Sequence, residues 1–234
     1  MNILAVCAHP DDLEVFCAGT LIKYHQAGHK IFIALTTSGN TGSNRIPSKY
    51  ETAKTREQEQ LNAASYINAQ VRFMRFDDEG LQDCPETRRA MLTTIRWANP
   101  DIIFVNPPAD GSTDHSNTGE LLVRVILSAG GRHHNSDLPP IDKKPQIFYF
   151  SSAGNIENMP RAYVDISDVI EIKKKMLYCH ESQYVWMQEF LEGDFCDSML
   201  HNSRILGVQA GCQYAEGFVA LNFSGYRGDY RLLP

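Results

Sequence analysis

The sequence predicts a single α/β domain with a Rossmann-like, mostly parallel sheet that has helices on both faces. Short, continuous apolar runs recur along the chain, which is typical of strands covered on both faces of a sheet. Between them lie longer segments with apolar residues at helical spacing, and strands that alternate with helices form mostly parallel sheets. The 234 residues suffice for one sizeable core, and no linker or repeat divides them. We therefore expect one domain over residues 1–234.

The first elements of the chain form a strand–helix–strand unit. Residues 3–8 are a continuous apolar run that predicts a strand. After a polar turn, apolar residues at helical spacing predict a helix from Leu13 to Ala27, ending where Gly28 can adopt a left-handed conformation. A second apolar run, residues 31–35, follows at once. A strand, a helix and a strand in this order predict a βαβ unit.

The same alternation continues through the rest of the chain. Three further helices and three further strands are expected at residues 51–67, 85–98 and 118–129 and at residues 71–76, 102–105 and 147–150. Beyond residue 160, a strand-like stretch at 164–166 leads into a basic helix at 168–180, and residues 216–223 form a last strand-like stretch. The three consecutive lysines at 173–175 are expected on a solvated face of that basic helix.

The composition restricts the partners of the protein. A formal net charge of −6 and a pI near 5.7 argue against a broad phosphate-binding surface, so we expect no nucleic-acid partner. No apolar run approaches the roughly 20 residues that a bilayer requires, and the first residues lack the basic flank of a signal peptide. We therefore expect no membrane partner. Six widely spaced cysteines without a C-x-x-C pair indicate free thiols in a cytoplasmic setting. Apolar surface in the C-terminal third is compatible with a homo-oligomer.

The segment that joins the first strand to the first helix concentrates ionisable side chains. It contains His9, Asp11, Asp12 and Glu14, and it leaves the carboxyl end of a strand, where α/β sheets bind ligands. His9 and Asp12 lie three residues apart at a helix start, so their side chains can converge on one point while Asp11 points elsewhere. Imidazole and carboxylate suit Zn²⁺, and a catalytic zinc site requires a third protein ligand.

The loop after the buried strand 102–105 offers the best third ligand. This loop runs from Asp110 to His115, and His115 would complete a His-Asp-His site. The competing histidines lie at the far end of the first helix or in later segments: His25, His29, His133, His134 and His180. A purely structural reading stays open, in which the paired aspartates, Ser112 or Asp114 only cap helices. The polar loops 37–49 and 130–144 are expected to border the site and to select the substrate.

Segments along nearly the whole chain resemble the LmbE-like (PIG-L) zinc-dependent de-N-acetylases. Residues 8–14, Ala-His-Pro-Asp-Asp-Leu-Glu, resemble the signature of that family. Asp110 with Asp114-His115 resembles the family's second metal motif. The other similar segments are residues 36–39, 56–59, 164–167, 173–175, 180–183 and 214–218. The resemblance implies that His9, Asp12 and His115 are zinc ligands and that Asp11 is the general base. It also implies that Arg56 contacts substrate, although the helical pattern alone suggests a surface arginine.

The second motif departs from the family pattern at Ser112. The family usually has a histidine there, which helps to stabilise the oxyanion, and a serine hydroxyl carries no charge. Three explanations stay open. Ser112 or a neighbouring group donates the hydrogen bond to the oxyanion, another histidine (His133, His134 or His180) reaches into the site, or the protein is a slow or specialised enzyme. Asp114 would then orient His115 by a hydrogen bond without binding the metal itself, and Asp110 is also expected next to the metal ligands without being one of them.

The resemblance implies hydrolysis of an N-acetyl group from an N-acetylglucosamine-type amino sugar or conjugate, giving acetate and a free amine. Two alternatives remain, namely an amidase for a larger acyl or thiol-conjugate amide, and a zinc-retaining binding protein with weak catalysis. A nucleotide-binding Rossmann protein fits less well, because the first turn holds carboxylates instead of a glycine-rich phosphate cradle. Another divalent metal in place of Zn²⁺ also stays open.

Overall fold

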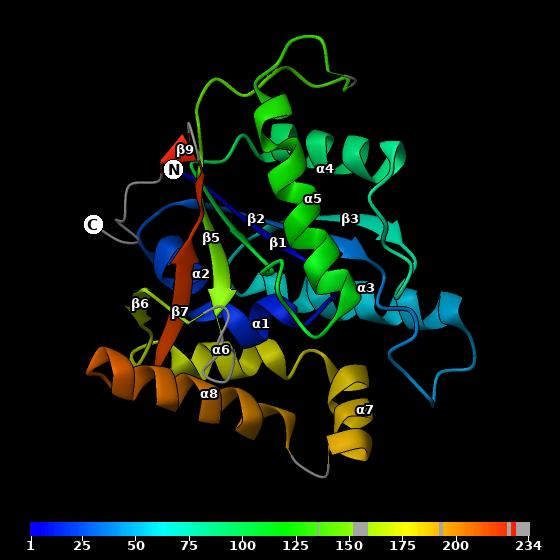
Figure 1. Ribbon diagram of the computed structural model, residues 1–234. Helices are drawn as coiled ribbons and strands as arrows, with labels where there is room; N and C mark the ends of the chain where they lie inside the picture. Colours follow the sequence, from blue (N-terminus) through cyan, green and yellow to red (C-terminus); the bar gives the residue numbers. More distant parts are fainter. Residues whose placement is uncertain (135, 152–158, 192–193, 224–225, 228–234) are drawn as a thin grey trace.

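The computed structural model has a central seven-stranded sheet with helices on both of its faces (Figure 1). It describes residues 1–134, 136–151, 159–191, 194–223 and 226–227. The strand order in the sheet is β3-β2-β1-β4-β5-β7-β6, and only β7 runs antiparallel to its neighbours among these seven. The predicted α/β class and mostly parallel sheet are therefore confirmed.

The elements follow one another with short connections. The strands of the sheet are β1 (Asn2–Cys7), β2 (Lys30–Thr37), β3 (Gln70–Phe76), β4 (Ile102–Val105), β5 (Gln146–Ser151), β6 (Ala162–Asp165) and β7 (Ala215–Ala220). A small separate hairpin is formed by β8 (Asn222–Phe223) and β9 (Tyr226–Arg227). The helices are α1 (Asp12–Phe16), α2 (Ala18–Gln26), α3 (Lys49–Ser65), α4 (Pro85–Ala98), α5 (Thr113–Ala129), α6 (Ile170–Leu177), α7 (Glu181–Leu191) and α8 (Phe195–Ala210).

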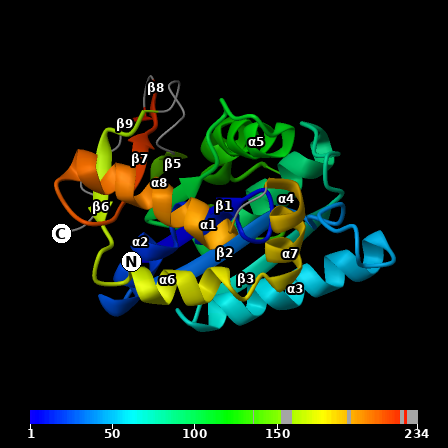
Figure 2. The ribbon, with the colours of Figure 1, turned by 90° about the horizontal axis from the view of Figure 1, so that it is seen from below.

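Successive side chains of the central strands lie alternately in two apolar cores, one on each face of the sheet. In β1, Ile3 and Ala5 belong to the core under α1, α2, α3, α6 and α8, whereas Leu4 and Val6 belong to the core under α4 and α5. Figure 2 shows α5 on one side of the sheet and α3 and α6 on the other. Because a strand turns successive side chains to opposite faces, a continuous apolar run is required when both faces are covered.

The single helix expected after β1 is broken at Cys17 into α1 and α2. The side chain of Glu216, on β7, accepts hydrogen bonds from the backbone nitrogens of Gly19 (2.8 Å) and Thr20 (2.7 Å) and so caps α2. The Gly19 backbone also lies so close to Ile166 that a Cβ atom would come within 2.6 Å of its Cγ2. The break therefore depends on contacts with the C-terminal part of the chain.

The expectation that all three lysines of the basic helix lie on a solvated face is wrong for one of them. Lys173 is fully buried, and its ammonium group donates to Glu216 (2.7 Å) and to the carbonyl of Val15 (2.9 Å). Lys174 and Lys175, by contrast, keep part or most of their surface in solvent. Lys173 thus neutralises the carboxylate that caps α2.

Helix α5 begins at Thr113, five residues before the predicted start, so His115 lies in its first turn. The helix has 17 residues and at 1.5 Å per residue spans about 25 Å. It carries the chain to the opposite end of the sheet, where the loop that follows α5 lies far from α7 and α8 (Figure 1). The expectation that residues 130–144 border the site is therefore wrong.

Helices α7 and α8 lie in a stretch where no helix or strand was predicted. They lie across the end of the molecule to which β5 points (Figure 1). None of the helices within the described ranges has the length and apolar character needed to cross a bilayer.

Candidate metal centre and cavity

The candidate site lies where the strand order reverses direction. The chain passes from β1 outward to β2 and β3, and then returns to β4 on the other side of β1. Strands β1 and β4 are parallel neighbours, so the loops after them meet at the carboxyl edge of the sheet. Such a switch point is where open α/β sheets bind ligands. Buried Asn106 links the two strand ends, since its Oδ1 accepts from the nitrogen of Ala8 (2.9 Å).

Three side chains from these two loops bring one potential ligand atom each to a common point. His9 Nδ1 lies 3.2 Å from His115 Nε2, and Asp12 Oδ1 lies 3.2 Å from His115 Nε2 and 3.8 Å from His9 Nδ1. A tetrahedral ion with bonds near 2.05 Å separates its ligand atoms by about 3.3 Å. The spacing and the donor types therefore fit a zinc-like divalent ion.

The atoms of this group that face away from the centre are held by hydrogen-bond partners. His9 Nε2 lies 2.9 Å from Asp78 and 3.4 Å from Asp114, and His115 Nδ1 lies 3.1 Å from Asp110. Carboxylates in these positions fix the ring orientation of a metal-bound histidine. The expectation that Asp114 orients His115 is wrong, because Asp114 contacts His9 and the carboxylate beside His115 belongs to Asp110.

Asp78 is a site residue that the sequence interpretation missed. It follows β3 in the acidic segment Asp77-Asp78-Glu79, and that position at the carboxyl end of a predicted strand was the available signal. Asp78 also accepts hydrogen bonds from the Thr41 hydroxyl (2.5 Å) and backbone nitrogen (3.2 Å). With His9 and Asp114 it forms a second His/Asp group.

Asp12 presents a single oxygen to the centre. Its other oxygen accepts from the backbone nitrogens of Ala8 (3.1 Å) and His9 (3.0 Å), which fixes the carboxylate plane. Burial alone would raise the pKa of Asp12, but His115 and His9 hold that pKa well below its usual range. An ionised, oriented carboxylate is the form that binds a cation.

Asp11 lies beside the three converging residues and is held by Arg56. Its backbone has a φ of 108°, a left-handed conformation that is strained for a residue with a side chain. The buried Arg56 guanidinium lies 3.3 Å from Asp11 Oδ2 and donates to the carbonyls of Pro10 (2.6 Å) and Gly39 (2.7 Å). Burial raises the pKa of Asp11 to about 6, against the opposing effect of Arg56. The surface position expected for Arg56 from its helical pattern is wrong.

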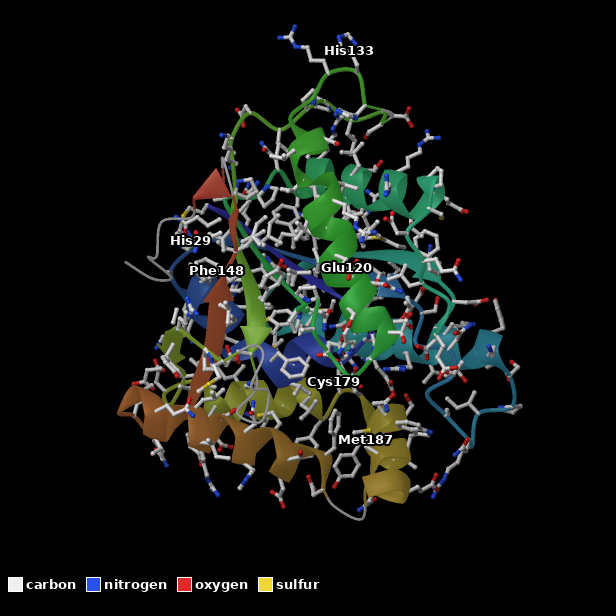
Figure 3. The ribbon with its side chains drawn as sticks, in the orientation of Figure 1. His29, Glu120, His133, Phe148, Cys179 and Met187 are labelled. Carbon is white, nitrogen blue, oxygen red and sulfur yellow. The ribbon has the colours of Figure 1, made fainter. Side chains whose placement is uncertain are left out.

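Ser112 is the residue before the first turn of α5, and it lines the same cavity. Its side chain makes no capping hydrogen bond to that helix. Among the described residues lining the cavity, His9 and His115 alone carry an imidazole. His133 lies at the tip of the distant loop (Figure 3), and His180 is fully buried next to Glu14. Neither supplies the histidine that the family usually has at position 112.

A buried polar network supports the turn from behind. Gln60 donates to Glu14 Oε1 (3.0 Å), and its own Oε1 lies 3.4 Å from the backbone nitrogen of Asp11. Glu14 Oε2 lies 3.2 Å from His180 Nε2. Burial alone would lower the pKa of His180, but Glu14 raises it above its ordinary value. Glu14, Gln60 and His180 are therefore structural neighbours of Asp11 that do not line the cavity.

The cavity in front of these residues has a volume of about 990 Å³. This is the upper part of the range of small-molecule sites. His9, Asp11, Asp12, Arg56, Ser112 and His115 all line it. The fold and the site together define a Rossmann-like α/β protein with a candidate metal centre at the switch point of its sheet.

Comparison with known proteins identifies the family. The model of the PIG-L family, described as GlcNAc-PI de-N-acetylase, matches residues 4–126, which is more than half of the 234 residues. The chain therefore belongs to the PIG-L family, as its motifs predicted. It is 29% identical over 229 residues to the diacetylchitobiose deacetylase of Thermococcus kodakarensis, covering 92% of this chain and 81% of that protein. The family and this relative are deacetylases, which are amide hydrolases.

Solved structures share the fold at low sequence identity. The N,N'-diacetylchitobiose deacetylase from Pyrococcus horikoshii superposes with a TM-score of 0.82 at 23% identity, covering 94% of this chain and 83% of that one. GalB, the 4-carboxy-2-hydroxymuconate hydratase from Pseudomonas putida, also has a TM-score of 0.82, at 18% identity, covering 97% of this chain and 99% of that one. Because one fold carries two named chemistries, the reaction has to be argued from the site.

Proposed function

We propose that the protein is a zinc-dependent hydrolase that removes the N-acetyl group from an N-acetylglucosamine-type amino sugar or conjugate, releasing acetate and a free amine. The observation that carries this proposal is the group of ligand atoms from His9, Asp12 and His115, all within 4.8 Å of one another, in one cavity with Asp11. Membership of the PIG-L family and the relative named diacetylchitobiose deacetylase support the reaction and the substrate class.

In this proposal His9, Asp12 and His115 hold one divalent ion. Two imidazoles and one carboxylate are a donor set that Zn²⁺ accepts in catalytic sites. An ion held there supplies Lewis acidity, which polarises the oxygen of an amide carbonyl. Asp78 and Asp114 keep the ring of His9 in place, and Asp110 does the same for His115.

Asp11 acts as the general base and then as the general acid. Its carboxylate accepts a proton from the attacking water and returns that proton to the nitrogen of the leaving amine. An amine leaves poorly unless it is protonated, so one carboxyl group serves both steps. Arg56 positions Asp11 and contacts the substrate from the same cavity wall. The Ser112 hydroxyl donates a hydrogen bond to the oxyanion that develops on the carbonyl oxygen.

The cellular setting follows from the thiols. All six cysteines are free, which supports a reducing, cytoplasmic environment. The three buried cysteines, Cys7, Cys17 and Cys196, pack in the apolar core.

The test is amine release from a panel of N-acetylglucosamine conjugates by zinc-loaded protein, beside an Asp11→Asn variant as control. We expect the protein to bind zinc in a 1:1 ratio. We also expect the rate of amine release to be about 10²–10⁴-fold lower in the variant. Release that is equal in both proteins would contradict the role of Asp11. Failure to bind any divalent ion would overturn the proposal, and zinc binding without release on any conjugate would favour a binding protein.

A further inference from the structure

The cavity has two chemically different walls. The loops after β1, β3 and β4 supply one wall, with the ligand group, Asp11 and Asp78. The other wall comes from three helices and is mainly apolar. Its apolar side chains are Val15 and Phe16 of α1, Trp186 and Met187 of α7, and Phe195 and Met199 of α8, and its polar ones are Gln183, Ser198 and Asn202. Metal binding and amide hydrolysis require only the first wall, so the apolar wall has no role in the proposed function so far.

The apolar wall begins next to the reacting groups. Val15 and Phe16 follow Asp12 by three and four residues in α1, and residues at that spacing share one helix face. One turn of helix, about 5.4 Å, therefore separates the metal ligand from the first apolar side chains. A group attached to the reacting amide or to its sugar reaches this wall without leaving the cavity.

The wall is a supported surface that keeps part of its area accessible. Phe16 stacks on Phe150 of β5 with ring centroids 5.8 Å apart, and Met187 packs against the same core cluster. Val15, Phe16, Trp186 and Met187 are all half-buried, whereas Met199 behind them is 1% exposed. Figure 3 labels Met187 on α7, the helix that lies across the end of the molecule beside α6 and α8. Side chains anchored in the core and open to the cavity form a preorganised apolar subsite.

We propose that this wall binds an apolar alkyl or aryl group carried by the amino-sugar substrate, so that the preferred substrates are amphipathic conjugates. The inference rests on the proposed function and adds the class of substrate. Methionine and aromatic side chains adapt to alkyl and aryl groups of varied shape. Each methylene buried against such a wall raises affinity about fourfold.

The experiment compares two substrate series on zinc-loaded protein. One series varies the glycoside (methyl, octyl and phenyl N-acetylglucosaminides), and the other varies the acyl group on glucosamine (acetyl, butanoyl and octanoyl). We expect kcat/KM to rise at least about tenfold along one series. The series that shows the rise tells whether the apolar group is the aglycone or the acyl chain. Equal kcat/KM along both series, with release of amine, would overturn this inference and leave the proposed function intact.

Variants of the wall separate the inference from general effects on the enzyme. Met187→Gln and Val15→Thr keep side-chain volume and add polarity, so we expect them to abolish the preference for apolar groups, measured as the ratio of kcat/KM between the longest and the shortest substrate of the series. Gln188→Met is the matched control, because Gln188 is exposed on the same helix and does not line the cavity. A preference that survives in both wall variants would contradict the inference.

Binding gives a readout without turnover. Two pairs of compounds are titrated calorimetrically into the Asp11→Asn variant: octyl and methyl N-acetylglucosaminide, and N-octanoylglucosamine and N-acetylglucosamine. In at least one pair, the octyl or octanoyl compound should have a dissociation constant at least about tenfold lower than its short partner. If no substrate releases amine while the octyl or octanoyl compound still binds more tightly, the proposed hydrolysis fails and the apolar subsite stands. If the two compounds bind equally in both pairs, the subsite is overturned.

Discussion

The buried pair of Lys173 and Glu216 yields a quantitative prediction about stability. Lys173→Met removes the ammonium group and leaves Glu216, 2% exposed, without its cation. The carboxylate keeps three other donors, namely the backbone nitrogens of Gly19 and Thr20 and the Thr20 hydroxyl at 2.6 Å. Removing one partner of a buried pair costs about 3–5 kcal/mol, and the three remaining donors place this case near 3 kcal/mol. For a chain of this size that loss lowers Tm by about 6–12 °C.

The assay is urea unfolding followed by circular dichroism, combined with a double-mutant cycle. Glu216→Gln alone leaves the buried ammonium of Lys173 without its counter-charge, although the Val15 carbonyl still accepts from it, and this variant is also expected to destabilise the protein. The double variant Lys173→Met/Glu216→Gln buries no charge, so its loss should be at least about 1 kcal/mol smaller than the sum of the two single losses. Lys175→Met is the matched control, because Lys175 is exposed on the same helix and should change stability by less than about 0.5 kcal/mol. A Lys173→Met variant as stable as the Lys175→Met control, or additive single losses, would refute the reasoning.

Three further predictions concern the site. Asp78→Asn should weaken zinc binding about 10–100-fold in a chelator competition, because His9 loses the carboxylate that orients its ring; unchanged affinity would remove Asp78 from that role. Ser112→Ala should lower kcat about 10²–10³-fold on the best conjugate, as expected for one lost oxyanion donor; an unchanged kcat means that another group donates. Glu14 raises the pKa of His180, so the stability from this contact is complete below the unfolded pKa and is lost as pH rises through the folded pKa. Urea unfolding from pH 5.5 to 9 should show that loss in the parent protein and a flatter profile in His180→Asn; parallel profiles would contradict it.

The spacing of apolar residues and the residues that mark the ends of an element were sufficient to predict elements that turn one regular apolar face, or both faces, to the core. The predicted helix 85–98 and strand 102–105 coincide with α4 and β4, because both combine strong apolar patterning with clear ends at Pro85 and Asn99. Helices α7 and α8 escaped prediction for the opposite reason. On α8, Val208 is 82% exposed, and on α7, Trp186 faces the cavity, so their apolar residues do not follow one core-facing stripe.

The sequence by itself determined the class of sheet and the main elements of the candidate site. Continuous apolar runs require strands covered on both faces, and parallel strands bring their carboxyl ends to one edge. Residues that follow two such strands therefore meet, as His9, Asp12 and His115 do.

The tertiary structure alone decided the partners of these residues. It placed Asp114 against His9 instead of His115, added Asp78, buried Lys173 against Glu216, and carried the loop 130–144 away from the site. Each of these outcomes depends on how elements far apart in the chain pack together. Local composition and periodicity carry no information about such contacts, because they report only which face of an element is buried and not what covers it.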